Sequence, residues 1–133
     1  MTDAYLARWL RHADRDLHVA ENELHTLTGD VITEAVCFHA QQAVEKYLKG
    51  YLVAKQIKFP RTHNLELLLE LCGADDPDFS ATDVTRLSFY AVEIRYPDEF
   101  LEPSLDDATE SVRIAQGMGL LVRKKLTERG LLP

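Results

Sequence analysis

The sequence predicts an all-α protein, an antiparallel up-and-down bundle of four to five helices in a single domain over residues 1–133. Apolar residues recur at helical spacing along nearly the whole chain, and no convincing strand pattern interrupts them. Glycines and prolines divide the chain into segments of helix length. A length of 133 residues is typical of one domain, and 46% hydrophobic with 28% charged residues is typical of a globular chain and argues against disorder.

The first predicted helix begins at Thr2 or Asp3 and ends at Gly29, a length of about six turns. Its apolar residues step by four and three, which predicts one buried seam. The seam consists of Leu6, Leu10, Ala13, Leu17, Ala20, Leu24 and Leu27.

The second predicted helix starts near Asp30 and ends at Pro60. Its apolar side is unusually wide, which favours a central helix that touches several neighbours. That side carries Val36, Cys37, Ala40, Ala43, Val44, Tyr47, Leu48 and Tyr51, whereas the polar side carries His39, Gln42, Glu45, Lys46 and Lys49.

Two shorter helices follow. Asn64 is a suitable N-cap for a leucine-rich helix, which we expect Gly73 and Pro77 to break. The next helix begins near Asp83 and ends at Pro97, with an apolar seam of Val84, Leu87, Ala91 and Ile94.

The last predicted helix opens with Ser104 followed three residues later by Asp107, which resembles a capping box, and ends at Gly130. Gly119 lies in its seam, where a glycine allows a neighbouring helix to approach closely. The seam is Leu105, Ala108, Val112, Ala115, Gly119, Val122 and Leu126. The predicted core of the whole bundle includes Leu10, Leu17, Val36, Ala40, Ala43, Tyr47, Leu68, Leu87, Ala91, Val112 and Val122.

Charge and composition restrict the functions that the chain can have. The net charge of −7 repels nucleic acid, so RNA or a nucleotide would need a local basic patch, such as the lysines and arginine at 46–61 or "RKK" at 123–125. The N-terminus lacks the apolar run of a signal peptide, and no stretch approaches the ~20 apolar residues of a membrane span. The two cysteines form no disulfide or metal pattern, so we expect a cytoplasmic protein.

Metal, cofactor and nucleophile motifs are missing from the sequence. No Glu or Asp has a His three residues later, as a di-iron bundle requires, and no glycine-rich phosphate loop occurs. Cys37 and His39 point about 160° apart on a helix, so they do not form a catalytic pair. We therefore expect no metal, no cofactor and no catalytic residue of these kinds. Two polar stretches remain, the stripe from His39 to Lys49 with Arg61 and His63, and "RYPD" at 95–98.

The stretch "CFHAQQAVEKYLKGYLVAKQIKFPRTHNLELLLELC" at 37–72 resembles the HEPN family, the higher eukaryotes and prokaryotes nucleotide-binding domains. The resemblance lies in the glutamines, Glu45, Lys46, Lys49 and "PRTHNL", and "RYPD" matches many small prokaryotic members. It spans nearly the whole chain. The resemblance implies a helical bundle, pairing into a homodimer, and one of three roles: nucleotide binding, partnership with a small nucleotidyltransferase, or toxin-like RNA cleavage.

Ribonuclease members of the family carry an arginine followed by four to six residues and then a histidine. Arg95 stands where that arginine is expected, but Phe100, Leu101 and Glu102 occupy the positions for the histidine. Phenylalanine cannot transfer a proton, so we expect little or no ribonuclease activity. Arg11 and His18 have the spacing but lie on the first helix, and we interpret that match as a coincidence.

We therefore predict a non-catalytic HEPN-type module that binds a nucleotide, a partner nucleotidyltransferase in a toxin–antitoxin-like pair, or both. The alternatives are an RNA-cleaving toxin with an atypical site and a structural homodimer without a ligand. Besides the resemblance, Phe38 and Val53 favour a homodimer, because they are apolar residues on the polar side of the second helix.

The predicted ligand groove is lined by Arg95, Tyr96 and Asp98, with His39, Lys46 and His63 as neighbours. Pro97 ends a helix there, which leaves the preceding side chains accessible. Arginine can bind phosphate through its planar fork and tyrosine can stack on a base. The alternative is that Arg95 only pairs with Asp98 or Glu99.

Overall fold

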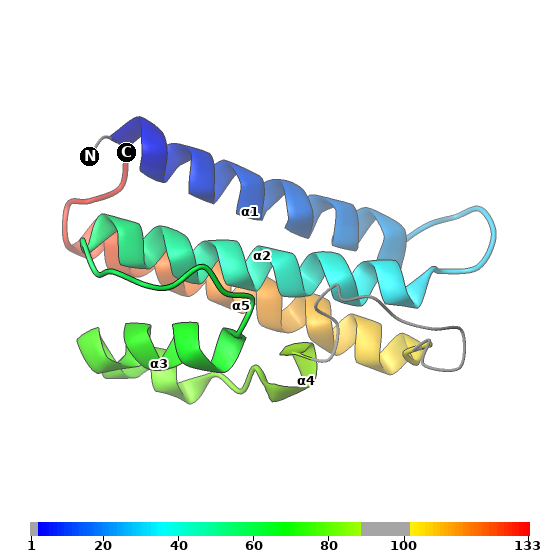
Figure 1. Ribbon diagram of the computed structural model, residues 1–133. Coiled ribbons are helices and arrows are strands. Elements are labelled where there is room, and N and C mark those ends of the chain that lie inside the picture. Colours follow the sequence, from blue (N-terminus) through cyan, green and yellow to red (C-terminus); the bar gives the residue numbers. More distant parts are fainter. Residues whose placement is uncertain (1–2, 89–101) are drawn as a thin grey trace.

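A computed structural model describes residues 3–88 and 102–133 (Figure 1). These residues contain helices and no strand, which confirms the all-α prediction. In chain order the elements are α1 (Asp3–Leu24), α2 (Thr33–Ala54), α3 (Leu65–Asp75), the 3₁₀ helix η1 (Pro77–Ala81), α4 (Thr85–Ser88) and α5 (Leu105–Glu128). None of the described helices has the length and apolarity needed to cross a membrane.

Helix α2 is the centre of the bundle and packs against α1, α3, α4 and α5. Helix α1 runs antiparallel to α2 and α5, as predicted for neighbours in an up-and-down bundle (Figure 1). Helices α2 and α5 run in the same direction, since Cys37 meets Ser111 and Tyr47 meets Gly119. Residues 55–64 carry the chain back along α2, so α3 also runs parallel to α2, with Cys72 against Leu48 (Figure 1). The chain then returns a second time over η1 and α4, since Asp78 binds Lys125 near the end of α5 and Arg86 binds Asp107 in its first turn.

Helix α1 packs closely on α2 because Gly50 has no side chain. A Cβ at Gly50 would lie 3.3 Å from Leu10 Cδ2 and 3.5 Å from Trp9 Cβ. The predicted seam of α1 is buried or partly buried up to Leu24. Leu27, however, is 99% exposed, so its assignment to the seam was wrong. The helix ends before Gly29 because the Thr26 hydroxyl binds the backbone of Thr28, a local turn that competes with the helix.

Helix α2 begins near the predicted position but ends before Pro60. It ends at Ala54 because Gln56 adopts a positive φ of 57° and the Ile57 N–H donates to the Leu52 carbonyl at 2.9 Å. This is a Schellman-type end with glutamine in place of glycine. The predicted apolar side is fully buried.

The polar side of α2 differs from the prediction at two positions. Glu45 and Lys49 were placed on the polar side, but their side chains are only 4% and 9% exposed. Residues 55–64 run back along this helix and contribute His63 to it, which explains the burial (Figure 1).

Helix α3 has the predicted N-cap, since Asn64 Oδ1 accepts from the Leu67 N–H at 3.0 Å. Gly73 does not break α3, contrary to the prediction, and the helix continues to Asp75. A Cβ at Gly73 would lie 2.7 Å from Ser80 Oγ, so the glycine is needed for close packing of η1. In the fourth predicted helix only Thr85–Ser88 is described as helical, and Ala91, Ile94 and Pro97 lie outside the described residues.

The ends of α5 follow the prediction. Ser104 and Asp107 form a complete capping box, with bonds of 3.0 and 3.2 Å. Gly130 has a positive φ of 67° directly after the helix. Leu105 is 55% exposed and therefore not part of the seam, since it occupies the first turn at the rim. Every other described residue of the predicted core is buried, except that Leu17 is only partly buried.

A network of charges fixes η1 to the end of α5. Asp76 accepts from Lys125 and from Arg129, each at 3.1 Å, and Lys125 also binds Asp78. The Asp78 backbone N–H, followed by these two cations, holds the pKa of Asp76 below its usual range. The network keeps α3 and η1 in place, and with them the end of the returning segment.

Candidate functional site

Asp16 of α1 forms a cluster with two side chains from the polar side of α2. Asp16 accepts from His39 Nδ1 at 2.9 Å through one carboxylate oxygen and from Lys46 Nζ at 2.5 Å through the other. His39 and Lys46 are seven residues apart on α2 and therefore share one stripe of the helix. We call these three residues the Asp16 cluster.

A second cluster of the same composition surrounds Glu45 of α2. Glu45 accepts from His63 Nδ1 at 2.9 Å and from Lys49 Nζ at 3.0 Å. Lys49 follows one turn after Glu45, whereas His63 comes from the segment that returns along α2 (Figure 1). We call Glu45, Lys49 and His63 the Glu45 cluster.

Two glutamines connect these clusters along α2. Gln42 lies on the stripe between His39 and Lys46 and donates to Gln41 Oε1 at 2.7 Å. Gln41 is fully buried and lies 3.4 Å from Glu45 through its amide nitrogen. The two clusters are thus linked through the buried amide of Gln41.

The two imidazoles and Lys46 reach solvent, whereas both carboxylates and Lys49, which is 9% exposed, are more buried. The exposed fractions are 69% for His63, 29% for His39 and 27% for Lys46, against 14% for Asp16 and 4% for Glu45. Because each histidine is held through Nδ1, its Nε2 remains for another partner. A ligand that approaches from solvent meets Lys46 and the two imidazoles before the carboxylates, and a neutral imidazole held in this way offers Nε2 as an acceptor, whereas a protonated one donates from it.

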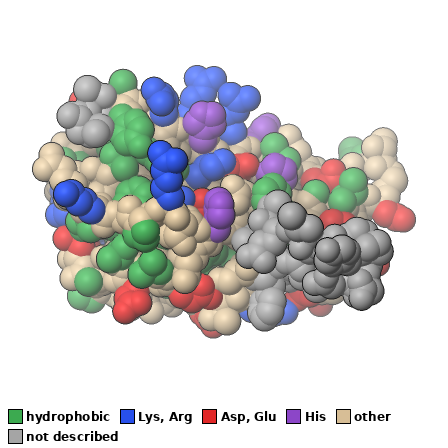
Figure 2. Space-filling view, viewed as in Figure 1, with side chains coloured by type: hydrophobic (Ala, Val, Ile, Leu, Met, Phe, Trp, Pro, Cys, Tyr) green, Lys and Arg blue, Asp and Glu red, His purple; other side chains and the backbone are tan. Residues whose placement is uncertain are grey.

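Basic residues of α1 and of the returning segment extend this surface. Arg8, His12 and Arg15 have the i, i+4, i+7 spacing of one helical stripe, beside the stripe of Trp9 and Asp16. Arg8, Arg15 and Arg61 are exposed and make no salt bridge within the described residues. Lysine, arginine and histidine side chains gather on this side of the molecule (Figure 2). We call the two clusters and these basic residues the histidine–lysine face.

The sequence-predicted site residues fall into two groups. Three of them, His39, Lys46 and His63, lie on the histidine–lysine face, with His39 and Lys46 joined through one carboxylate. The other three, Arg95, Tyr96 and Asp98, lie outside the described residues.

The roles of the two carboxylates that organise this face were not predicted from the sequence. Asp16 directly precedes Leu17 of the predicted α1 seam, so it lies at the border of a helix–helix contact. That position was the feature of the sequence from which a partner on the neighbouring helix could have been predicted. Glu45 was placed on the polar side of α2 without a partner, because its partner His63 is 18 residues away.

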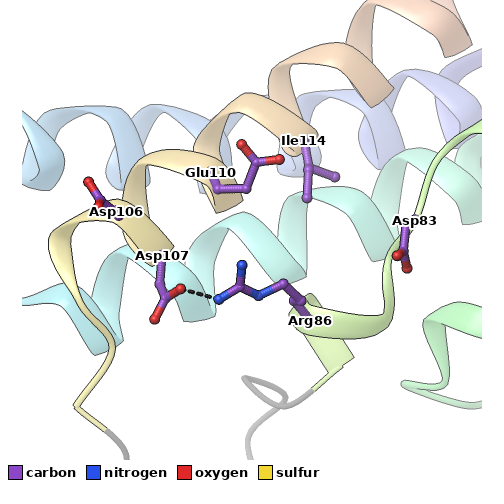
Figure 3. Close-up of a pocket in the computed structure, with 6 residues that line it drawn as sticks. All are labelled: Asp83, Arg86, Asp106, Asp107, Glu110 and Ile114. Atoms are coloured by element: carbon purple, nitrogen blue, oxygen red, sulfur yellow. Dashed lines mark hydrogen bonds and ion pairs between the residues drawn. The ribbon is translucent and has the colours of Figure 1, made fainter.

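A pocket of about 380 Å³ lies between α4 and the first turns of α5 (Figure 3). Four carboxylates and one guanidinium line it, and Arg86 is already bound by Asp107. The excess of negative charge disfavours a phosphate there. Its lining residues are Asp83, Arg86, Asp106, Asp107, Glu110 and Ile114.

A cavity of about 260 Å³ lies where α1 meets the C-terminal residues, next to a tightly paired group. Asp14 accepts from both terminal nitrogens of Arg123, at 2.9 and 2.7 Å, and from the Tyr47 hydroxyl at 2.5 Å. Burial, and then Asp14, raise the pKa of Tyr47 well above its usual range. These groups satisfy one another. Among residues 3–88 and 102–133 no group of three or more ligating side chains is placed to hold a metal.

Comparison with known proteins identifies the family. The sequence model of the HEPN domain matches residues 6–125. Neither the curated proteins nor the solved structures gave a match. The matched region contains α2, both clusters and "RYPD", the parts that carried the resemblance in the sequence. The match covers most of the chain, and the protein therefore belongs to the HEPN domain family.

Proposed function

We propose that this HEPN protein binds the phosphate of a nucleotide on the histidine–lysine face and does not cleave RNA. The observation that supports the proposal is the pair of clusters in which a carboxylate holds one histidine and one lysine, so that His39, His63 and Lys46 have fixed positions at the surface. Held side chains lose less conformational freedom when a ligand binds. The carboxylates thereby fix Lys46 and the two imidazoles in place.

The charge of the clusters alone is too small for a phosphate. Asp16 offsets Lys46, and Glu45 offsets Lys49, so each cluster has little net charge while its histidine is neutral. Arg8, Arg15 and Arg61 supply the additional positive charge. The family resemblance adds Arg95, Tyr96 and Asp98 to the proposed site.

We expect the variant Lys46→Ala to bind a nucleotide about 10- to 150-fold more weakly, because a hydrogen bond to a charged group contributes roughly 1.5–3 kcal/mol. Calorimetric titration of wild type and variant with adenosine 5′-monophosphate measures this. Lys124→Ala is the matched control, since Lys124 is an exposed lysine of α5 outside the histidine–lysine face. Arg95→Ala, titrated in parallel, tests whether Arg95 contributes.

Equal affinities of wild type and Lys46→Ala would place the nucleotide elsewhere or nowhere. Equal affinities of wild type and Arg95→Ala would limit Arg95 to an ion pair with Asp98 or Glu99. A similar loss of affinity in Lys124→Ala would mean that nucleotide binding depends on the net charge of the protein and not on the position of Lys46.

We extend the proposal to the partners that the family suggests. A small nucleotidyltransferase, in a toxin–antitoxin-like pair, and a second copy of this chain are the proposed partners. A reading frame for a nucleotidyltransferase beside this gene would support the first, and light scattering tests the second. Both cysteines are free thiols, as is usual in the cytoplasm, where we propose that the protein acts.

RNA cleavage at an atypical site is the second candidate function. It is favoured by the two histidines, each held through Nδ1 by a carboxylate, an arrangement that suits imidazoles in proton transfer. One imidazole would accept the proton of a ribose 2′-hydroxyl as its oxygen attacks phosphorus. The other would give a proton to the departing 5′-oxygen, which leaves a 2′,3′-cyclic phosphate and a 5′-hydroxyl.

We expect no cleavage of single-stranded RNA by the purified protein, since the family's histidine is replaced at Phe100 and its neighbours. Gel analysis after incubation with wild type, His39→Ala and Arg95→Ala checks this. Cleavage that is lost in His39→Ala would establish the second function. Cleavage that is lost only in Arg95→Ala would show that the family site works without its histidine.

A further inference from the structure

Two neighbouring aromatic rings lie between two cations at the edge of the histidine–lysine face. The rings of Tyr5 and Trp9 meet edge to face, with centroids 6.2 Å apart. Lys49 Nζ lies 5.8 Å from the Trp9 ring centroid, and the Arg8 guanidinium carbon lies 5.8 Å from that of Tyr5. We call these four residues the aromatic corner. It adjoins the Glu45 cluster directly, because Lys49 belongs to both.

We propose that the aromatic corner holds the base of the bound nucleotide, while the Asp16 cluster holds its phosphate. This inference rests on the proposed function and adds the orientation of the ligand. A surface that recognised phosphate alone would have no use for aromatic rings between its cations. Stacking on aromatic side chains is the usual way in which proteins hold bases without reading their identity.

The spacing along α1 fits one nucleotide. Trp9 and Asp16 lie seven residues apart, so they share a stripe and are separated by about 10 Å along the helix axis. This distance is comparable to the span from the base to the phosphate of a nucleoside monophosphate. On α2, Lys49 lies beside Trp9 and Lys46 binds Asp16. Each end of the proposed nucleotide site therefore has a lysine from α2, and the order fits because α1 and α2 are antiparallel.

The indole nitrogen of Trp9 is a second, independent observation in favour of a ligand at the aromatic corner. This nitrogen is buried and has no hydrogen-bond partner, which holds for no other buried side-chain nitrogen or oxygen in the described part of the chain. Such a group is unfavourable in a folded protein unless another role maintains it. The ring as a whole remains partly exposed beside Lys49.

The tryptophan also provides a direct measurement, because the chain contains one tryptophan. We expect adenosine 5′-monophosphate to change the fluorescence of Trp9 in a saturable manner. Ribose 5-phosphate, which lacks the base, should compete with the nucleotide but leave the fluorescence unchanged. A fluorescence change with ribose 5-phosphate equal to that with the nucleotide would contradict stacking.

Calorimetry on variants separates the two ends of the ligand. Trp9→Leu should lower the affinity for adenosine 5′-monophosphate by about tenfold or more, which is the effect of losing one stacking contact. It should leave the affinity for ribose 5-phosphate unchanged. Trp9→Tyr keeps an aromatic ring and should retain most of the nucleotide affinity. Lys46→Ala should lower the affinity for both ligands.

The outcomes distinguish this inference from the proposed function. If Trp9→Leu lowers the affinities for both ligands equally, or lowers neither, the base does not lie at Trp9. Nucleotide binding by the wild type, and with it the proposed function, would still stand. If Trp9→Tyr binds the nucleotide as poorly as Trp9→Leu, stacking is not the cause. If the wild type binds neither ligand, the proposed function and this inference both fail.

Discussion

Replacing Glu45 by alanine is expected to lower the free energy of unfolding by about 3–5 kcal/mol, the effect of breaking a buried ion pair. The Lys49 side chain is only 9% exposed, and its ammonium group would remain without a carboxylate. His63 would lose its partner in the same substitution. The unpaired buried charge accounts for most of the expected loss.

Urea unfolding of wild type and Glu45→Ala measures this difference. The matched control is Glu110→Ala, because Glu110 pairs with Arg113 three residues away on the exposed side of α5. An exposed pair of this kind contributes roughly 0–1 kcal/mol. Equal losses in the two variants would show that the Glu45–Lys49 pair is screened by solvent despite its burial.

A double variant separates the structural from the functional role of this pair. Glu45→Leu combined with Lys49→Met removes both charges and keeps similar volumes, and such replacements often restore stability. We expect the double variant to be much more stable than Glu45→Ala and to bind nucleotides more weakly than wild type. A double variant as stable as wild type that binds less nucleotide would show that the ion pair serves the ligand rather than the fold; unchanged nucleotide binding would contradict that role.

Three helix ends were predictable from the sequence because their causes are local. The cap at Asn64 and the capping box of Ser104 and Asp107 use residues three positions apart. Gly130 likewise ends α5 through its own backbone conformation. These three predictions were confirmed, whereas the ends expected from Gly29 for α1, Pro60 for α2 and Gly73 for α3 were wrong.

The burial of charged residues was not predictable in the same way. Helical periodicity assigned Glu45 to the polar side, but it could not show that a later segment returns over that side and buries it. Gly73 is a related case, since its role depends on Ser80 of the next element. In the site, periodicity placed His39 and Lys46 on one stripe, whereas their shared carboxylate, Asp16, depends on how α1 packs against α2.

Two glycines of α5 allow the packing of α2 against α5 to be tested with a built-in control. Gly117 is exposed, and a Cβ there would have no atom within 4 Å. A Cβ at Gly119 would lie 2.8 Å from Tyr47 Cζ and 3.0 Å from its hydroxyl oxygen. The same substitution to alanine should therefore have opposite effects at two positions of one helix.

We expect Gly117→Ala to stabilise the protein by about 0.5–1 kcal/mol, since alanine is the better helix former. We expect Gly119→Ala to destabilise it by about 1–2 kcal/mol, because overpacking costs about 1–3 kcal/mol and the gain in propensity offsets part of it. The Tyr47 ring cannot move aside easily, since it is buried and its hydroxyl is fixed by Asp14 at 2.5 Å. Thermal and urea unfolding of both variants measure the difference.

A stabilised Gly119→Ala variant would mean that α2 and α5 can separate at no cost, which would contradict the close packing of Tyr47 on α5. This packing also concerns the site. Tyr47 lies between Lys46 and Leu48 on α2 and binds α1 through Asp14, two residues before Asp16. A shift of Tyr47 would displace α1 relative to α2, and with it the carboxylate that positions His39 and Lys46. Gly119→Ala is therefore expected to weaken nucleotide binding as well, whereas Gly117→Ala should leave it unchanged.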